Sequence, residues 1–299
     1  MSGSALEGAP SATASSLSEP AAPPPVFDTP IPEPVEGPLA VPRRVLARGS
    51  AYRTVLPPVV FGLVFLGVWQ LLVVGLKIEP YLVPSPTAIW AEFLANLPSI
   101  LDGALHTGAN ALVGLVVGTV VGVLAAVVAS LWRLADSLGA PLVAALSVMP
   151  IVALAPVLYT MFGADVETGR QFVAALAVLI PVYLNTLRGL RQVRPVHRDL
   201  MRAYAASARQ QQLAVTLPTA APYLFTGLRI ASSLAVISAL VAEYFGGPIG
   251  GLGRSITSAA ASSNYPLAWA YVVGAILLGL LFYCVALGVE TWSTRHQPT

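Results

Sequence analysis

Six apolar segments, each about long enough to cross a bilayer, are the feature that most constrains how this chain can fold. They lie at about 55–76, 105–132, 138–162, 170–190, 219–244 and 266–290. A spanning helix needs about 20 apolar residues, because the hydrocarbon core is about 30 Å thick and each residue adds about 1.5 Å. Composition agrees, since 56% of the residues are hydrophobic and only 10% are charged. We therefore expect an all-α integral membrane protein with six transmembrane helices.

The residues outside these segments divide the chain into one transmembrane domain and two tails. Residues 1–50 are rich in Pro, Ser and Ala and poor in large apolar side chains, which predicts a disordered tail. This stretch lacks the basic start and short apolar core of a cleavable signal peptide. Residues 51–292 form the predicted transmembrane domain, and residues 293–299 form a second short tail.

Two local features refine this outline. In the connection Pro80–Leu101, apolar residues recur at helical spacing, which predicts a helix lying in the membrane interface. These residues are Ile89, Trp90, Phe93 and Leu94. The only cysteine, Cys284, excludes an internal disulfide, and we interpret it as a small buried hydrophobic side chain.

The basic residues predict the orientation of the chain. Only Lys77, Arg170 and Arg254, of 16 Lys and Arg residues, fall on one side of the predicted spans. The remainder, which include Arg43, Arg44, Arg48 and Arg295, fall on the other side, and such a bias marks the cytoplasmic side. Both termini are therefore expected in the cytoplasm. A basic run follows the fourth span and either attracts anionic lipid headgroups or contacts a partner protein. It consists of Arg188, Arg191, Arg194, Arg198 and Arg202.

The chemistry available inside the predicted spans is sparse. Glu243 and Arg229 are ionisable and lie near span ends, while Gln70, Asn110 and Asn185 are polar. Proton-coupled carriers use intramembrane Asp, Glu or His relays, and no such chain is visible here. The three histidines are scattered, which argues against a metal site, and no nucleophile lies beside a base. A phosphate-binding loop needs Lys after Gly, and the only Lys is Lys77, so any ATP hydrolysis must come from another subunit.

Glycine and proline positions suggest where helices pack and where a pathway could open. Gly114, Gly118 and Gly122 share one face of the second span, which predicts close packing against another helix. Pro150 and Pro156 interrupt the third span and are candidate gating positions. Pro141 and Pro181 are further candidate kinks in the third and fourth spans.

Glu243 and the glycine-rich loop that follows it form a second candidate gate. The loop runs from Gly246 to Gly253 and includes Gly250 and Gly251, whose flexible backbone allows re-entrant geometry. Glu243 either braces an outer gate beside this loop or is an interfacial carboxylate in water. Both interpretations stay open at this point.

The polar segment Asp199–Pro218, between two apolar segments, carries a family resemblance. It resembles the cytoplasmic loop of the inner-membrane permeases of binding-protein-dependent ABC importers, which reads Glu-Ala-Ala, three residues, Gly, nine residues, an aliphatic residue, one residue and Leu-Pro. Here Asp199 takes the Glu position, Ala205 the Gly, Val215 the aliphatic residue and Leu217-Pro218 the ending. Leu200 and Met201 replace the two alanines.

Flanking motifs place the resemblance in the nitrate/sulfonate/taurine-type branch of these permeases. They are YLVPSP at 81–86, IPVYLNTLRGLRQV at 180–193, LPTAAPYLFTGLRIA at 217–231, and the pattern of Ala242 and Glu243 followed by GGLG at 250–253. The similarity covers about 55–292, which is nearly all of the chain outside the tails.

The resemblance implies the permease subunit of a type I ABC importer in a bacterial inner membrane. It implies a second permease copy, two cytoplasmic ATPase subunits that bind ATP and Mg²⁺, and an extracytoplasmic solute-binding protein, with no cofactor in this chain and no nucleic-acid partner. It also implies a coupling helix at 198–216 that inserts into each ATPase. The ATPase-coupling residues would be Asp199, Arg202, Ala203, Ala205, Ser207, Leu213, Val215, Leu217 and Pro218.

Within that segment, two structural expectations follow. If the family Gly supplies a turn with positive φ, Ala205 would be strained there, so we expect a continuous helix through Ala205 instead. We also expect Pro218 to end this helix before the fifth span. A stand-alone secondary transporter or channel is the alternative function, and a membrane-embedded enzyme is a third.

Overall fold

The computed structural model describes residues 51–163, 166–246 and 250–294. The predicted tail at 1–50 and residues 295–299 of the predicted tail at 293–299, with the arginines in them, lie outside the described residues. The chain divides into two units, Met1–Pro57 and Pro58–Thr299. In the first unit, the described residues form the start of helix α1. All contacts discussed below lie within the second unit.

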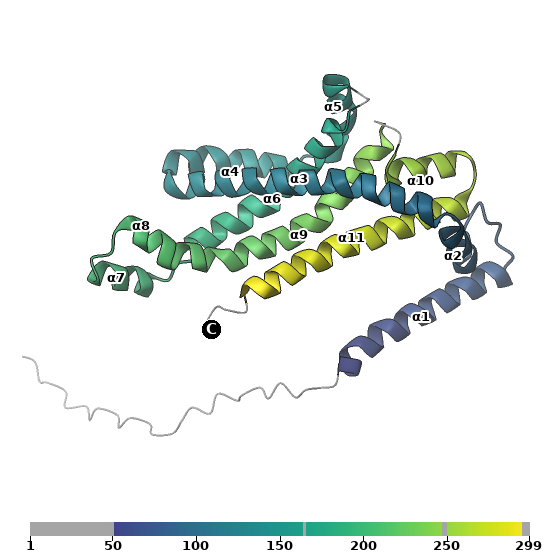
Figure 1. Ribbon diagram of the computed structural model, residues 1–299, viewed down its shortest axis with the longest axis horizontal. Coiled ribbons are helices and arrows are strands. Elements are labelled where there is room, and N and C mark those ends of the chain that lie inside the picture. The colour runs from purple at the N-terminus through teal and green to yellow at the C-terminus, as the bar shows by residue number, and fades with distance from the viewer. Residues whose placement is uncertain (1–50, 164–165, 247–249, 295–299) are drawn as a thin grey trace, which may run out of the picture. The chain divides into compact units, whose positions relative to one another are not determined.

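Helices make up the described part of the chain, which contains no strand (Figure 1). In chain order they are α1 (Ala51–Gly75), α2 (Pro86–Ala95), α3 (Leu97–Leu131), α4 (Arg133–Val148), the 3₁₀ turn η1 (Ile151–Leu154), α5 (Ala155–Phe162), α6 (Thr168–Arg191), α7 (Pro195–Ala203), α8 (Ala208–Gln211), the π-helical turn η2 (Gln212–Thr216), α9 (Leu217–Tyr244), α10 (Leu252–Ala261) and α11 (Tyr265–Thr294). This agrees with the expected all-α class.

Five helices in the described residues are long and apolar enough to cross a membrane. They are Leu56–Gly75, Leu97–Leu131, Thr168–Arg191, Ala208–Tyr244 and Tyr265–Ser293. They correspond to five of the six predicted spans, although the second begins at Leu97 and the fifth at Ala208, both earlier than expected. The residues just before the predicted second span, 97–104, are therefore helical as well.

The expectation of one helix over 138–162 is wrong. That stretch is divided into α4, η1 and α5, none of which is long enough alone to cross a bilayer. The break falls at Met149, whose extended backbone (φ −73°, ψ 131°) precedes Pro150. A residue before proline avoids the helical conformation because the proline ring clashes with it. A sixth spanning segment in this region stays a prediction.

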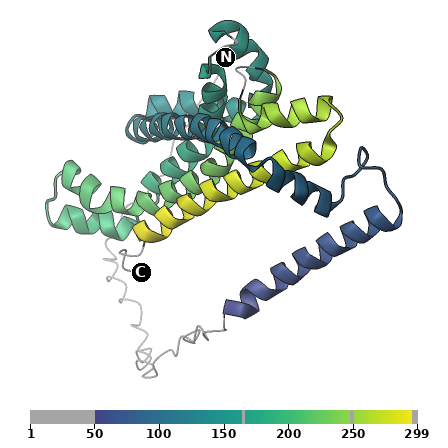
Figure 2. The same cartoon turned by 45° about the vertical axis from the view of Figure 1, so that its right-hand side comes forward.

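Four helices, α3, α6, α9 and α11, form the packed core, and the two views show them running alongside one another (Figures 1 and 2). Gly114, Gly118 and Gly122 lie where α3 crosses α6, as predicted. A Cβ atom at Gly122 would lie 3.0 Å from the carbonyl oxygen of Leu179, and one at Gly114 or Gly118 would overlap α6. The absence of these side chains lets the two backbones approach closely.

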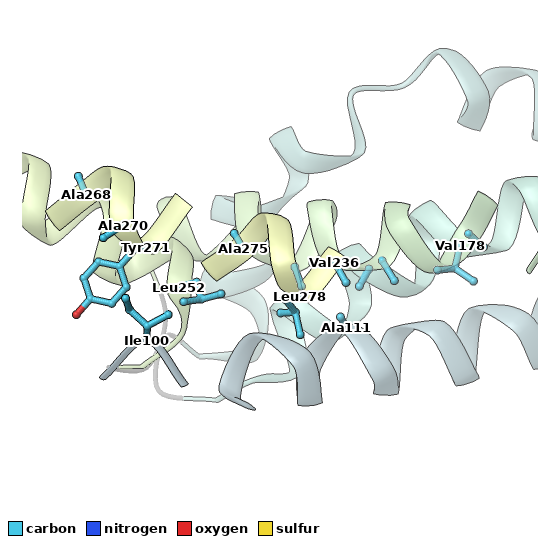
Figure 3. Close-up of a cluster of buried hydrophobic side chains, with 14 of the residues drawn as sticks. Ile100, Ala111, Val178, Val236, Leu252, Ala268, Ala270, Tyr271, Ala275 and Leu278 are labelled. Atoms are coloured by element: carbon cyan, nitrogen blue, oxygen red, sulfur yellow. The ribbon is translucent and has the colours of Figure 1, made fainter. Parts of the chain in front are cut away.

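Small side chains continue this close packing across the core. Ala111, Ala174, Ala231, Ala235 and Ala239 are fully buried. Figure 3 shows a neighbouring part of the same cluster, where Ile100, Leu252 and Leu278 lie between α3, α10 and α11. Alanine costs little side-chain entropy when it is buried, so such a core depends on contact distance rather than on large side chains.

Helix α2 confirms the helix predicted between the first two spans. Ser85 caps its first turn by accepting a hydrogen bond from the Ala88 N–H at 3.3 Å. Ile89 and Phe93 are buried, on a helix that packs against α11, whereas Trp90 and Leu94 are exposed. The position of α2 in the membrane interface stays a prediction.

Cys284 differs from its expected environment. It is exposed on α11 rather than buried. Its neighbours Tyr283 and Val285 are also exposed. In a spanning helix, an apolar surface of this kind faces either lipid or another protein.

Candidate functional site

The segment predicted to couple to an ATPase is two short helices joined by a turn, not one helix over 198–216. Helix α7 ends at Ala203, and Ala205 has φ +49°. The Ala206 N–H donates to the Met201 carbonyl and the Ala205 N–H to the Arg202 carbonyl, both at 2.9 Å. This pair of bonds defines a Schellman turn, in which the left-handed position usually belongs to Gly. The expectation of a continuous helix through Ala205 is therefore wrong, and Ala205 adopts the strained conformation.

Ser207 starts the second short helix. Its hydroxyl accepts a hydrogen bond from the Gln210 N–H at 3.3 Å, and the Gln210 side chain accepts one from the Ser207 N–H at 2.8 Å. This reciprocal arrangement is a capping box, which satisfies two N–H groups that a helix start otherwise leaves unbonded. Two strong local signals, a C-terminal turn and an N-terminal cap, therefore follow each other within 203–210.

Pro218 does not end the second helix, contrary to expectation. Residues Ala208–Tyr244 form one continuous helical stretch, and Pro218 lies in the first turn of α9. Just before it, η2 widens to a π-helical turn in which the Leu217 N–H donates to the Gln212 carbonyl, five residues earlier. A proline inside an α-helix clashes with the carbonyl four residues before it, and a widened turn relieves that clash. The second half of the predicted coupling segment is thus the start of a membrane-spanning helix.

Exposed apolar side chains gather on the two short helices. Val196, Leu200 and Tyr204, spaced four residues apart, are 66%, 53% and 77% exposed. Leu213 in η2 and Leu217 at the start of α9 are exposed as well. The four-residue spacing of Val196, Leu200 and Tyr204 is the sequence signal that could have predicted this apolar face. A face of this kind on a polar, charged segment is typical of a protein contact.

A groove of about 360 Å³ separates α7 from the η2–α9 junction. It is lined by His197, Leu200, Met201, Ala214, Val215, Pro218 and Thr219. Val215 and Pro218 are the predicted coupling residues that the structure brings together here. Asp199 and Arg202 instead form an exposed ion pair at 3.4 Å. An exposed pair of this kind contributes at most about 1 kcal/mol.

At the other end of α9, Glu243 is buried and accepts hydrogen bonds from α3 and α10. The Thr107 hydroxyl on α3 donates to its carboxylate at 3.0 Å, and the Gly253 N–H on α10 donates to it at 2.8 Å. The Leu252 N–H in turn donates to the Thr107 oxygen at 2.8 Å. The carboxylate is fully buried, which excludes the alternative of an interfacial carboxylate in water.

The glycines predicted beside Glu243 are required by this contact. Gly251 has φ +91°, and a Cβ atom there would lie 2.5 Å from the Glu243 carboxylate carbon. Gly253 packs equally closely against Glu243, and Gly250 has φ +130°. The structure thus brings four of the predicted gate residues together; residues 247–249 of the loop lie outside the described part.

A second polar cluster, missed by the sequence analysis, surrounds Arg170 beside Glu243. The Arg170 side chain is fully buried and donates to Glu167 at 2.9 Å and to the Gly246 carbonyl at 3.3 Å. The Asn110 side chain on α3 also donates to Glu167, at 2.8 Å. The Tyr159 hydroxyl on α5 donates to the Ala242 carbonyl at 2.9 Å. We define these contacts together with those of Glu243 and Thr107 as the polar lock, which joins α3, α5, α6, α9 and α10.

The remaining gate candidates occupy a different kind of position. Pro150 precedes η1, and Pro156 lies in the first turn of α5. Both are exposed, and neither interrupts a continuous helix, so they delimit short elements rather than kink long ones. Pro141 and Pro181, in contrast, lie inside α4 and α6 as expected. No cluster of His, Cys, Asp or Glu among the described residues could hold a metal ion.

Long apolar helices packed through small residues, with a two-helix polar segment at one end, define a polytopic membrane protein. Residues 118–296 match the family model of the binding-protein-dependent transport system inner membrane component. The chain therefore belongs to the permease subunits of binding-protein-dependent ABC importers, in the nitrate/sulfonate/taurine-type branch, as predicted. Subunits of this family are not ATPases.

Individual relatives agree with this assignment. The chain is 35% identical over 236 residues to the riboflavin transport system permease protein RibX of Chloroflexus aurantiacus, covering 77% of this chain and 86% of that protein. It is 33% identical over 180 residues to the putative aliphatic sulfonates transport permease protein SsuC of Escherichia coli, covering 59% and 67% of the two chains. A crystal structure of an amino acid ABC transporter with histidines shares the fold, with a TM-score of 0.56 and 14% identity over 67% of this chain and 96% of the other.

Proposed function

We propose that two copies of this permease subunit form the pathway for a small solute and that two separate ATPase subunits bind the segment α7–α8. The observation that carries the proposal is the exposed apolar face of this segment, defined by Val196, Leu200 and Tyr204, at the start of a continuous helix into the membrane. ATP and Mg²⁺ would be bound by the ATPase subunits. Closure of these subunits would move α7–α8, and the continuous helix would carry that movement into the pathway.

The positions carried over from the family motif have distinct roles in this proposal. Ala205 and Ser207 set the angle between α7 and α8 through the Schellman turn and the capping box. Leu213 and Leu217 extend the apolar contact, and Val215 lines the groove beside α7. Asp199, Arg202 and Ala203 belong to α7 and would contribute its polar rim and last turn. Pro218 would fix the wide turn at which the segment joins α9.

The polar lock would hold the opposite end of the bundle closed when the ATPase subunits are apart. Glu243 joins three helices through one buried carboxylate, and Gly251 and Gly253 allow that contact. An extracytoplasmic solute-binding protein would deliver the solute at this end. Both termini and α7–α8 would then lie in the cytoplasm of a bacterial cell, and the Arg188–Arg202 run would meet anionic lipid headgroups.

The coupling proposal is tested by placing a charge on the apolar face of α7. We expect Leu200→Glu, at a position 53% exposed, to fold and insert but to lose the co-purifying ATPase subunit, because a carboxylate would have to be desolvated in the contact. Leu82→Glu is the matched control: it makes the same change at a 65% exposed leucine between α1 and α2. Tagged protein is extracted from the native membrane, and ATPase subunits are quantified by mass spectrometry. Equal ATPase recovery for both variants would contradict the proposal.

A further inference from the structure

A cavity of about 700 Å³ with a mixed polar and apolar lining lies between the start of α3, helix α10 and the start of α11. Its lining includes Asp102, Arg254, Ser255, Ser258, Ser262 and Tyr271. Ligand pockets in proteins span about 300–1,000 Å³, so the cavity is of the size that holds a small organic molecule. It lies at the same end of the bundle as the polar lock and has no part in the contacts of α7–α8.

The cavity is lined by one acidic and one basic side chain, Asp102 and Arg254, whose charges cancel. Asp102 approaches it from α3 and is 74% exposed, with only His106 nearby at 3.9 Å. Arg254 approaches from α10, and no Asp or Glu in the described residues lies within ion-pair distance of its guanidinium. The Asp102 carboxylate and the Arg254 guanidinium lie on different helices and can bind complementary groups of the same molecule. A site for a simple anion would instead show an excess of positive charge.

Hydroxyl groups supply the rest of the polar surface. Ser255 and Ser262 donate to the carbonyls of Gly251 and Ala259, which leaves their oxygens able to accept further hydrogen bonds. The hydroxyl groups of Ser258 and Tyr271 make no hydrogen bond to another group of the described residues, and each can both donate and accept. Figure 3 shows the Tyr271 ring beside Ile100 and Leu252, with its hydroxyl directed away from these apolar side chains. The cavity wall therefore contains both hydrogen-bond donors and hydrogen-bond acceptors.

The polar lock fixes the wall that carries these groups. Helix α10 begins at Leu252, and the N–H groups of Leu252 and Gly253 are bound by Thr107 and the Glu243 carboxylate. Gly103 allows α3 to approach Leu252, whose side chain would lie 3.2 Å from a Cβ atom at that position. A wall held by buried hydrogen bonds is preorganised, so little ordering would accompany binding.

We propose that this cavity is a solute-binding site for electrically neutral polar molecules that carry both hydrogen-bond donors and acceptors. The proposal rests on the proposed function, because the solute would reach the cavity from the binding protein before it enters the pathway. Asp102 would accept from donor groups of the solute, Arg254 would donate to its carbonyl groups, and Tyr271 would contact its flat or apolar part. Small monovalent anions would be poor ligands.

Cysteine labelling tests the site directly, because the chain has a single native cysteine. In a Cys284→Ser background, Ser258→Cys places a thiol in the cavity, and Thr257→Cys on the same helix, outside the lining, is the matched control. The full chain in lipid nanodiscs is treated with a charged maleimide, with and without riboflavin or ethanesulfonate as probes. We expect riboflavin at about ten times its Kd to slow labelling of Ser258→Cys about tenfold, and to leave Thr257→Cys unchanged.

Two further variants separate binding from simple obstruction. Asp102→Asn and Arg254→Gln, each combined with Ser258→Cys, should abolish protection by riboflavin while the labelling rate without probe stays the same. Protection by ethanesulfonate but not riboflavin would overturn the proposal in favour of an anion site, and absence of protection by either probe would overturn it altogether. Since labelling requires no ATPase, such a failure would leave the coupling role of α7–α8 unaffected.

Discussion

Individual glycines in α3 decide how closely two membrane helices approach. At Gly118, the carbonyl oxygen of Ala175 and the Val178 side chain occupy the space that any Cβ would need. At Gly288 in α11, no atom lies within 4 Å of that space. A side chain is therefore excluded at Gly118 and tolerated at Gly288, and the sequence alone does not distinguish the two positions.

We expect Gly118→Ala to destabilise the protein by about 1–3 kcal/mol, because an added methyl group in a well-packed contact forces backbone shifts. Gly288→Ala should be neutral or stabilise by up to about 1 kcal/mol, since alanine has the higher helix propensity. Thermal unfolding of both variants in the same detergent measures the difference. Indistinguishable midpoints would show that α3 and α6 are not packed as described.

Part of the polar chemistry at this scale is predictable from the sequence. Glu243 and the glycines after it stood out, because a carboxylate beside an apolar segment is rare. Its partner Thr107 and the Arg170 cluster did not, because Thr107 and Glu243 are 136 positions apart in the chain. A pattern read along one chain does not place such partners together. The burial of Arg170 likewise depends on the approach of α9.

At the scale of elements, long apolar helices were predictable and their interruptions were not. Hydropathy predicted α1, α3, α6, α9 and α11, because burial in lipid requires about 20 apolar residues in succession. The break at Met149–Pro150 leaves hydropathy unchanged, since it arises from proline sterics within an apolar run. The sequence did not predict the turn after α7, because the left-handed position of such a turn is usually a glycine and here it is Ala205.

The left-handed backbone at Ala205 predicts opposite effects for two neighbouring substitutions. Ala205→Gly should stabilise the α7–α8 segment by about 1 kcal/mol, because glycine adopts φ +49° without the steric cost that alanine bears. Ala203→Gly, at the last residue of α7, should destabilise by up to about 1 kcal/mol through lower helix propensity. Hydrogen exchange of the α7 amides reports both effects. A loss of protection in Ala205→Gly would mean that the turn is not left-handed.

At the scale of the whole molecule, charged contacts occur near both ends of the helical core. Near the α7 end, Arg191 binds Asp136 at 2.6 Å and Arg229 binds Glu290 at 3.1 Å. At the other end lies the polar lock. Between these ends the buried contacts are made largely by small side chains, among them Ala231, Ala235 and Ser232. The sequence predicted the surplus of Arg near one end but not these pairs.

The predicted orientation can be checked on intact cells in a Cys284→Ser background. Arg198→Cys on α7 should react with a membrane-impermeant maleimide only after the cells are opened, whereas Glu79→Cys between α1 and α2 should react at once. Both native side chains are exposed, so the rate of labelling depends on whether the maleimide reaches that side of the membrane. The reverse pattern would place α7–α8 outside the cell and would rule out contact with a cytoplasmic ATPase.

The π-helical turn at Gln212–Thr216 fixes the helical phase between the ATPase-facing surface and the membrane. A stretch of 37 residues, Ala208–Tyr244, would extend about 55 Å, so a small rotation at one end becomes a displacement at the other. A π-helical turn holds about one residue more than an α-helical turn, so removing one residue from it would restore an ordinary α-helix and leave the orientation of α8 relative to α9 nearly unchanged. Inserting one residue into the α-helical part between α8 and the membrane would instead rotate α8 by about 100° and misdirect the apolar face of the segment, while every contact of the membrane core stays in place.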